Sequence, residues 1–343
     1  CRHMNDIESH YCETSRHTTH YLAAGPEAGP LIIFIHGWPE LSISWRHQLP
    51  FFAAMGFRAI APDMRGYGDS SVYDKHSDYQ LSLAVQDMVE LLAHLNRASA
   101  VWVGHDWGSP VAWSIAAHHP DKCLAVANLC VPYAALEQGL DFVIDKVDRN
   151  IYPEAEYPAG QWEYMRFYQE SFSSATASMD ADPFNFIQLI FRKGNPASVG
   201  QPSATAMTRK MGGWFGGEKS APAVPRDEDV ITEEDLARYA EALGRHGFFG
   251  PNSWYMNHEA NAEYFTHAKN DHRLEMPALF IGADYDSTCE TKTSRLTEPM
   301  RQWCQNLEEV SIASGHWMAQ EKPREVNRAL VRWMAQKVPD VWT

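Results

Sequence analysis

Residues 99–118 read SAVWVGHDWGSPVAWSIAAH, and this stretch predicts a β-strand that turns sharply into an α-helix. A β-rich run over residues 100–103 stops at Gly104, and an amphipathic pattern starts after Gly108. Small residues flank the turn because a strand that reverses into a helix leaves no room there for side chains. Such a turn lifts the side chain at its apex, here Asp106, above the edge of the sheet. The alternative interpretation is an ordinary Gly-Asp turn between a strand and a helix.

An aspartate at this apex changes the chemistry that the turn can perform. A serine needs a base before it becomes a nucleophile, whereas a carboxylate near its reference pKa is already ionised at neutral pH. The carboxylate of Asp106 can therefore attack a tetrahedral carbon and leave an alkyl ester on the protein. The substrate then needs a carbon that carries a strained or departing heteroatom. An epoxide or an alkyl halide meets this need.

The composition limits the class of protein and its partners. The chain has 343 residues, of which 45% are hydrophobic, enough for one large α/β domain or for a core with a second lobe. The net charge of −15 argues against nucleic acid and anionic membrane surfaces as partners. No apolar run approaches membrane-spanning length, and the polar, His-rich N-terminus does not resemble a signal peptide. The six cysteines form no CxxC pair, so we expect free thiols and a cytoplasmic location.

Strand-like segments alternate with helical segments in the first third of the chain and again near its end. The expected strands are 31–35, 58–61, 100–103, 124–130, 278–282 and 309–312, and the expected helices include 82–95, 108–118 and 324–336. This alternation predicts an α/β fold with a doubly wound, mostly parallel sheet.

The middle of the chain has a different texture. Residues 134–267 are rich in aromatic residues, Met, Gly and Pro, and they show helical runs without β alternation. A helical insertion between strands of one sheet is typical of a cap, or lid, over an active site. We therefore expect an α/β core of residues 1–133 and 268–343 and a helical cap of residues 134–267. The alternative is that this stretch extends a single domain.

An aspartate nucleophile needs a base for the water that later cleaves the ester, and an acid that holds this base. After an elbow of this kind, the acid and then the histidine follow along the chain. His316 follows the last expected strand and is the predicted base. Asp286 and Asp284 both emerge at the carboxyl end of strand 278–282; we favour Asp286, which lies further into the loop, and interpret Asp284 as a turn-capping residue. The other histidines, such as His3, His10, His17, His94 and His119, are expected at the surface.

The loop that follows strand 31–35, with the sequence HGWP at 36–39, can direct a backbone N–H into the site. The N–H of Trp38 and that of Trp107 would then stabilise the oxyanion that forms when water attacks the Asp106 ester. The stretch DMRGYGDS at 63–70 closes the next strand, and we expect its carboxylates to be structural.

The order of these motifs resembles that of the soluble-type epoxide hydrolases over nearly the whole chain. The matching segments are HGWP at 36–39, RGYGDS at 65–70, GHDWG at 104–108, DYD at 284–286, GHW at 315–317 and EKP at 321–323. The resemblance implies an α/β-hydrolase fold with a helical cap, the opening of epoxides to vicinal diols without cofactor or metal, and a role in detoxification. It also implies a cis bond between Trp38 and Pro39. Ser109 departs from the pattern, which often has a second glycine there.

The cap decides which leaving group the site accepts. An epoxide oxygen needs a hydrogen-bond donor, and tyrosine, with a pKa near 10, stays protonated at pH 7. GPNSWYMN at 250–257 resembles the family segment that carries one donor, which implies Tyr255. EYMRFYQE at 163–170 resembles the segment with the other, which implies Tyr164, with Tyr168 one helical turn away as the alternative.

We therefore expect an epoxide hydrolase that acts through an Asp106 ester. The alternatives are a haloalkane or haloacetate dehalogenase and a non-catalytic ligand receptor on the same fold. The expected substrate is a small hydrophobic epoxide, and the protein is expected to be a monomer or homodimer. The expected pocket residues are His36, Pro39, Trp107, Tyr168, Trp254 and Trp317. Phe184, Phe186, Trp214 and Phe215 add apolar surface in the cap.

Overall fold

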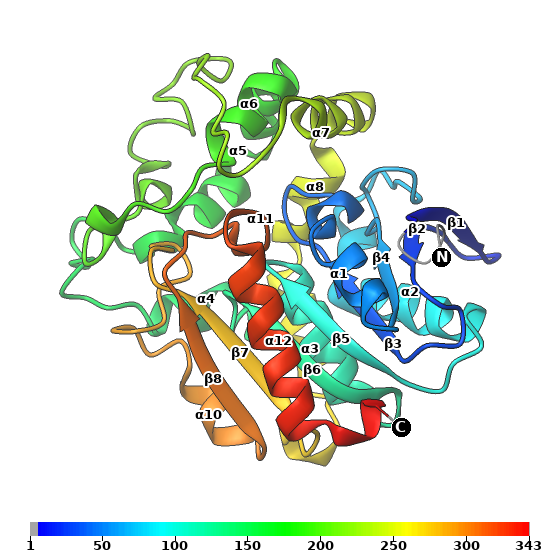
Figure 1. Cartoon of the computed structure of the whole chain (residues 1–343). Coiled ribbons are helices and arrows are strands. Elements are labelled where there is room, and N and C mark those ends of the chain that lie inside the picture. The colour runs from blue at the N-terminus through cyan, green and yellow to red at the C-terminus, as the bar shows by residue number, and fades with distance from the viewer. Residues whose placement is uncertain (1–5, 343) are drawn as a thin grey trace.

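A single eight-stranded sheet forms the centre of the molecule (Figure 1). The computed structural model describes residues 6–342, so the predictions for Cys1 and His3 lie outside the described residues. The strands are β1 (Glu8–Glu13), β2 (Thr18–Ala24), β3 (Leu31–Ile35), β4 (Arg58–Pro62), β5 (Ala100–His105), β6 (Cys123–Leu129), β7 (Ala278–Ala283) and β8 (Leu307–Ile312). Their order in the sheet is β1-β2-β4-β3-β5-β6-β7-β8. The neighbouring strands β4, β3, β5, β6, β7 and β8 all run parallel. All six predicted strands are present.

Helices cover both faces of this sheet and extend beyond one edge of it (Figure 1). They are α1 (Leu49–Ala54), α2 (Leu81–His94), α3 (Gly108–His118), α4 (Leu140–Asp145), α5 (Glu163–Asp180), α6 (Pro183–Ile190), α7 (Glu233–His246), α8 (Phe249–Ser253), α9 (His258–Phe265), α10 (Glu298–Trp303), α11 (Met318–Glu321) and α12 (Pro323–Lys337). Helices α1 and α12 lie on one face, where Asn327 donates a hydrogen bond to the His47 carbonyl. Helices α2 and α3 pack together on the other face. The predicted α/β class is confirmed.

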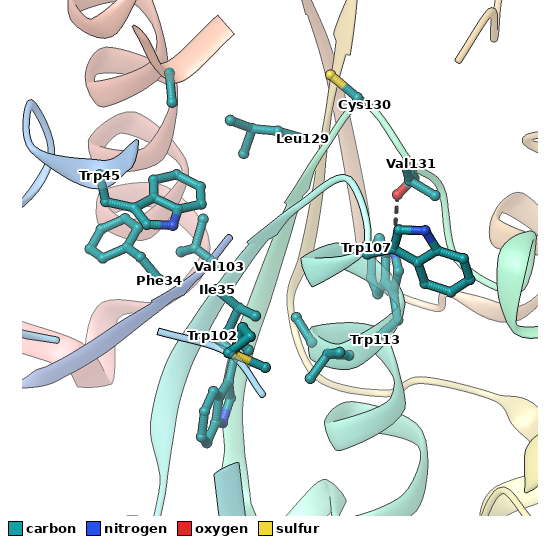
Figure 2. Packing of buried hydrophobic residues seen from close by; sticks show 14 of the residues in the cluster. Phe34, Ile35, Trp45, Trp102, Val103, Trp107, Trp113, Leu129, Cys130 and Val131 are labelled. Carbon is teal, nitrogen blue, oxygen red and sulfur yellow. Dashed lines mark hydrogen bonds between the residues drawn. The ribbon is translucent and has the colours of Figure 1, made fainter. Parts of the chain in front are cut away.

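The central strands are buried on both faces, which explains their continuous apolar sequences. Every residue of β3 and β5 is buried. Figure 2 shows Phe34 of β3 against Trp45, with ring centroids 5.1 Å apart. On α3, Trp113 is fully buried and donates a hydrogen bond of 3.0 Å to the carbonyl of Val131. The aromatic residues thus fill the space between the sheet and its helices.

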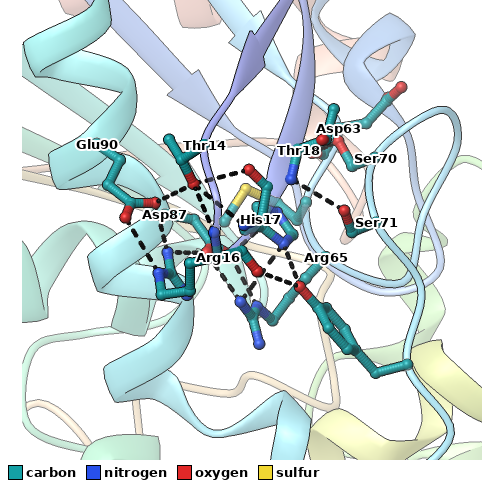
Figure 3. Close-up of polar contacts among 12 residues, drawn as sticks. Thr14, Arg16, His17, Thr18, Asp63, Arg65, Ser70, Ser71, Asp87 and Glu90 are labelled. Atoms are coloured by element: carbon teal, nitrogen blue, oxygen red, sulfur yellow. Dashed lines mark hydrogen bonds and ion pairs between the residues drawn. The ribbon is translucent and has the colours of Figure 1, made fainter.

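The antiparallel pair β1 and β2, a hairpin at one side of the sheet, was not predicted from the sequence. A buried ion-pair network ties this hairpin to the rest of the molecule (Figure 3). Asp87 on α2 accepts hydrogen bonds from Arg65 at 2.7 and 2.8 Å and also pairs with Arg16 in the hairpin. His17, expected at the surface, is instead buried in this network, where burial lowers its pKa to about 4. The surface prediction for His17 was wrong because the hairpin brings it against Asp87.

Residues 134–267 contain helices and no β-strand among the described residues. Helices α5, α6 and α7 lie beyond the end of the sheet where β8 finishes and the chain continues into α11 (Figure 1). This is where the parallel strands end, so the inserted segment stands over their carboxyl ends. The five described cysteines are free thiols, as predicted. In the described part of the chain, every helix is too short or too polar to cross a lipid bilayer.

Candidate active site

Asp106 lies at the apex of the turn between β5 and α3. Its φ of 56° falls in the left-handed region, which residues other than glycine rarely adopt. Close packing makes small neighbours necessary, because a Cβ on Gly108 would lie only 2.1 Å from the carbonyl oxygen of Ile35. The glycines that predicted the turn are therefore required where β3, β5 and α3 meet.

The two backbone N–H groups expected in the oxyanion site both contact the Asp106 carboxylate. Its Oδ2 accepts hydrogen bonds from the N–H of Trp38 at 2.9 Å and from the N–H of Trp107 at 2.6 Å. Gly37 permits this approach, because a Cβ there would lie 2.3 Å from the Cβ of Asp106. Burial opposes the charge, but contacts with His316 and with the Trp38 N–H outweigh it and lower the pKa of Asp106. The carboxylate is thus held in its ionised, nucleophilic form. The Trp38–Pro39 bond is cis.

His316 lies between two carboxylates. Its Nε2 is 3.0 Å from Oδ1 of Asp106, and its Nδ1 is 2.6 Å from Oδ2 of Asp286. A carboxylate on each ring nitrogen favours the imidazolium, in which both nitrogens donate. Burial acts against this cation, but Asp286 and Asp106 raise the pKa of His316 well above its usual value. The three residues form one hydrogen-bonded chain from the elbow to the loop after β7.

The loop after β7 shows which of its two aspartates reaches His316. The other oxygen of Asp286, Oδ1, accepts the backbone N–H groups of Thr288 and Cys289, each at 3.1 Å. Burial opposes ionisation of Asp286, but His316 and the Cys289 N–H lower its pKa. Asp284 instead pairs with Lys292, with 2.6 Å between Oδ1 and Nζ. The structure therefore brings Asp286, and not Asp284, to the histidine.

Of the three cap tyrosines considered as donors, two share a cavity with Asp106. Tyr164 and Tyr255 line this cavity, and their ring centroids are 5.5 Å apart. Tyr168 does not line the cavity, and its hydroxyl accepts a hydrogen bond of 3.2 Å from the indole of Trp214. Burial raises the pKa values of Tyr164 and Tyr255 well above 10, so both remain protonated donors.

The cavity has a volume of about 230 Å³, and its wall is mostly apolar. The lining residues are Trp38, Asp106, Tyr164, Ile190, Ser203, Ala204, Thr205, Trp214, Tyr255, Thr288, Cys289, His316 and Trp317. Of the apolar cap residues noted in the sequence, Trp214 lines the cavity, Phe186 is buried behind it against Phe215, and Phe184 is 43% exposed.

Only Trp317 among the six expected pocket residues lines this cavity. The other five, His36, Pro39, Trp107, Tyr168 and Trp254, are buried and do not line this cavity, so their part in binding a substrate stays a prediction. His36 donates to the Gly37 carbonyl at 2.9 Å and accepts from the Met64 N–H at 3.0 Å, so it braces the oxyanion loop. The indole of Trp254 donates to the Arg65 carbonyl at 3.2 Å. Trp254 thus joins the cap to the core behind the cavity wall, whereas His36 joins two loops of the core. Sequence position alone does not show whether a side chain lies in the cavity wall or behind it.

A second buried pair supports the site and was missed in the sequence. The ring Nδ1 of His105 lies 3.0 Å from Oε2 of Glu40, which also accepts the N–H of Gly37 at 2.8 Å. Burial acts against the His105 cation, but Glu40 raises the pKa of His105 to about 10. The signal was available: His105 immediately precedes the apex residue, and Glu40 follows the HGWP segment.

Three groups of side chains in the described residues bring potential metal ligands within 4.8 Å of one another. They are His105, Cys130 and His316; Asp286, Cys289 and His316; and His20, Asp63 and Asp69. In each group an imidazole is already hydrogen-bonded to a carboxylate: His105 to Glu40, His316 to Asp286, and His20 to Asp63 at 2.7 Å. A metal ion would have to displace these bonds.

Known proteins share this chain's sequence and architecture. A family model described as alpha/beta hydrolase fold matches residues 30–323. Bifunctional epoxide hydrolase 2 of Sus scrofa is 32% identical over 317 residues, which are 92% of this chain and 53% of that protein. Epoxide hydrolase A of Mycobacterium tuberculosis is 33% identical over 326 residues, covering 91% of this chain and 92% of that protein. The chain thus spans about half the length of the mammalian relatives that it matches and nearly all of the mycobacterial one.

Solved structures of epoxide hydrolases also resemble this chain. The crystal structure of Epoxide Hydrolase A from Mycobacterium thermoresistibile matches with a TM-score of 0.78 and 29% identity, covering 96% of this chain and 98% of that one. The resemblance inferred from the motifs is confirmed: this chain belongs to the α/β-hydrolase fold family and, within it, to the epoxide hydrolases.

Proposed function

We propose that this chain hydrolyses epoxides to vicinal diols through an ester on Asp106. One arrangement carries the proposal. Oδ2 of Asp106 accepts hydrogen bonds from two backbone N–H groups, and Oδ1 contacts Nε2 of His316. Two protonated tyrosines line the same cavity. A nucleophile, a base and donors for the departing oxygen thus meet in one mostly apolar space.

In the first step, Oδ1 of Asp106 attacks a ring carbon of the epoxide and the carbon–oxygen bond breaks. Oδ1 is the attacking atom because Oδ2, which accepts both N–H groups, is already held as the future carbonyl oxygen. The hydroxyls of Tyr164 and Tyr255 hydrogen-bond the ring oxygen, and one of them gives its proton to the alkoxide as it forms. Solvent returns a proton to this tyrosinate, which balances the proton that His316 loses to solvent before the second step. The product is a hydroxyalkyl ester on Asp106.

In the second step, His316 takes a proton from a water molecule, and this water attacks the carbonyl carbon of the Asp106 ester. Formation of the ester removes the negative charge of Asp106, one of the two charges that raise the pKa of His316. The imidazole therefore becomes better able to lose its proton to solvent and act as a base after the first step than before it. Asp286 holds Nδ1, so Nε2 is the atom directed at the ester. The N–H groups of Trp38 and Trp107 stabilise the tetrahedral oxyanion, which collapses and releases the diol.

The same proposal assigns residues 1–133 and 268–343 to the catalytic core and residues 134–267 to the cap. Two facts support this division: all eight described strands lie outside 134–267, and the two donor tyrosines lie inside it. The free state of the five described cysteines supports a reducing compartment such as the cytoplasm.

The mechanism is tested by detecting the covalent ester on Asp106. Asp106→Ala should abolish diol formation from an aryl epoxide such as styrene oxide, and His316→Gln should accumulate a covalent adduct, seen by intact-mass and peptide mass spectrometry on the peptide that contains residue 106. In a single turnover in ¹⁸O-labelled water, the first diol should carry unlabelled oxygen from Asp106. Full turnover by either variant would refute the mechanism.

The dehalogenase alternative is tested in the same experiment by measuring halide release from a 1-haloalkane. A halide site needs free donors: the indole of Trp38 already donates to Asn252 at 2.9 Å, whereas the buried indole N–H of Trp107 has no hydrogen-bond partner among the described residues, so halide release has to be measured. Halide release without diol release would favour that alternative. Binding of epoxide without either product would favour a receptor.

A further inference from the structure

Three hydroxyl side chains form a polar cluster in the wall of the cavity. Ser203 and Thr205 come from the cap, and Thr288 comes from the loop after β7. Oγ1 of Thr205 donates to Oγ of Ser203 at 2.9 Å, and Oγ of Ser203 lies 3.0 Å from Oγ1 of Thr288. We call Ser203, Thr205 and Thr288 the hydroxyl cluster.

The hydroxyl cluster has hydrogen-bonding capacity that its own members do not use. The two short contacts consume two of its three protons, and the third pair, Thr205 and Thr288, is 3.4 Å apart, at the limit of a hydrogen bond. One O–H and several lone pairs therefore remain for a partner in the cavity. Ser203 is 5% exposed and Thr205 9% exposed, so bulk water has little access to these two, whereas Thr288 is partly exposed. Buried polar groups of this kind are stabilised by a hydrogen-bond partner.

The surroundings restrict what that partner is. The rest of the cavity wall is aromatic, aliphatic or part of the site already described. Lysine and arginine are both missing from the cavity-lining residues that the structure describes, while Asp106 adds a negative charge. The imidazolium of His316 also lines the cavity, but it is already paired with Asp286 and Asp106. A carboxylate would therefore enter without a free counter-ion and next to a like charge, at high desolvation cost. A neutral oxygen, which either accepts or donates, fits the cluster.

The hydroxyl cluster also has a defined place relative to the reacting atoms. The backbone N–H of Thr288 bonds to Oδ1 of Asp286, whose Oδ2 bonds to His316. The cluster thus lies on the side of the cavity formed by the loop after β7. A substituent of the epoxide that extends from Asp106 toward this loop meets the three hydroxyls.

We propose that the preferred substrate is a neutral epoxide with an ether, hydroxyl or carbonyl oxygen in the arm that contacts Ser203, Thr205 and Thr288, and with otherwise apolar substituents. This inference rests on the proposed function and adds the substrate class to it. The cluster selects among epoxides by one hydrogen bond, while the aromatic wall supplies apolar contact.

The experiment compares 1,2-epoxyoctane with its oxa-analogues, in which one ether oxygen replaces successive methylene groups; butyl glycidyl ether is one member. For each, kcat/KM is measured from the diol produced. One ether should be preferred over 1,2-epoxyoctane, and Thr288→Val, which keeps the shape but removes the hydroxyl, should lower that preference about three- to tenfold. The readout is the ratio of kcat/KM for the ether to kcat/KM for 1,2-epoxyoctane, because a merely structural role for Thr288 would lower both values by the same factor and leave the ratio unchanged.

Matched variants complete the test. Ser203→Ala should also lower the preference, and it carries the test if Thr288→Val fails to fold. Thr208→Val is the control, because its hydroxyl donates to the Thr205 carbonyl at 2.8 Å but does not line the cavity; the preference should be unchanged. 7,8-Epoxyoctanoate, with a carboxylate at the end of the same chain, should be a poorer substrate than 1,2-epoxyoctane.

Three results are distinguishable. An ether preference that survives both Thr288→Val and Ser203→Ala, or a preference for the carboxylate, overturns the inference and leaves the proposed function standing. Failure to form diol from any of these epoxides overturns the proposed function, and the inference with it. Loss of the preference in both variants, with diol still formed from 1,2-epoxyoctane, supports both.

Discussion

The Nε2 of His105 donates a hydrogen bond of 2.7 Å to the backbone carbonyl of His316. The other nitrogen of the same ring contacts Glu40, which accepts the N–H of Gly37. One buried ion pair therefore connects the segment of the catalytic histidine with the loop that presents the Trp38 N–H. We infer that Glu40 and His105 are positioning residues that fix the distance between the base and the oxyanion site.

Glu40→Ala should reduce kcat about 10- to 100-fold, because it leaves the His105 cation and the Gly37 N–H without their partner, and a hydrogen bond to a charged group is worth about 1.5–3 kcal/mol. Glu40→Gln keeps a neutral carbonyl oxygen that can accept both the Gly37 N–H and the Nδ1–H of His105, so it should recover part of kcat. Single-turnover kinetics with mass detection of the ester would measure both steps, with the melting temperature as the control for folding. Unchanged kcat in Glu40→Ala would contradict the role.

Tyr164→Phe and Tyr255→Phe should each slow formation of the ester about 10- to 100-fold, since each removes one hydrogen bond to an oxygen that becomes charged. Hydrolysis of a preformed ester should change little, because the tyrosines act on the departing ring oxygen. Tyr168→Phe is the matched control: its hydroxyl bonds to Trp214 and does not line the cavity. Rapid-quench measurement of the ester separates the steps. An equal loss in Tyr168→Phe would show that the sequence alternative, Tyr168, deserved the donor role.

Asp286→Asn should lower the rate of ester hydrolysis by roughly 10²–10⁴, as expected when the partner of a catalytic histidine loses its charge. Asp286 raises the pKa of His316, so its loss moves that pKa down. The acid limb of the single-turnover hydrolysis profile should therefore shift to lower pH while the plateau falls. Asp284→Asn, which removes the partner of Lys292, is the control and should keep the profile. An acid limb that stays in place would argue against Asp286 as the partner of the base.

The parts of the fold and site that could be predicted are those set by local backbone constraints. Gly104 and Gly108 had to be small for β5 to turn into α3, so the position of Asp106 could be inferred from the sequence. His316 and Asp286 follow the ends of parallel strands, and such ends meet at one edge of a sheet. The comparisons confirm the fold class and the family, whereas the roles of these residues stay predictions.

The parts that could not be predicted depend on contacts between distant segments. His17 is buried only because Asp87, 70 residues away in α2, lies beside it, and a polar N-terminal sequence carries no sign of this. Trp254 and Trp317 are both aromatic residues next to site motifs, yet Trp317 lines the cavity while Trp254 packs behind it. The way the cap packs on the core decides whether an aromatic ring lines the cavity or lies behind its wall. The spacing of residues along the chain does not show how the cap packs.

Glu137, buried below the cap, makes stability depend on pH. Its Oε2 accepts the N–H of Ala134 at 2.8 Å, while Oε1 is buried without a hydrogen-bond partner among the described residues. Burial raises the pKa of Glu137 from 4.5 to about 8. The folded state then binds more protons than the unfolded state between these values. The free energy of unfolding therefore decreases as pH rises from about 4.5 to about 8.

Glu137→Gln removes this titration, so the variant should be more stable than the parent at pH 8, by a few kcal/mol, and should lose its advantage near pH 4.5. Urea unfolding from pH 5 to 9 measures the difference. Glu154→Gln, at an exposed position, is the control and should leave the pH dependence of stability unchanged. A Glu137→Gln protein whose stability falls with pH as steeply as the parent's would show that Glu137 is already ionised in the folded state.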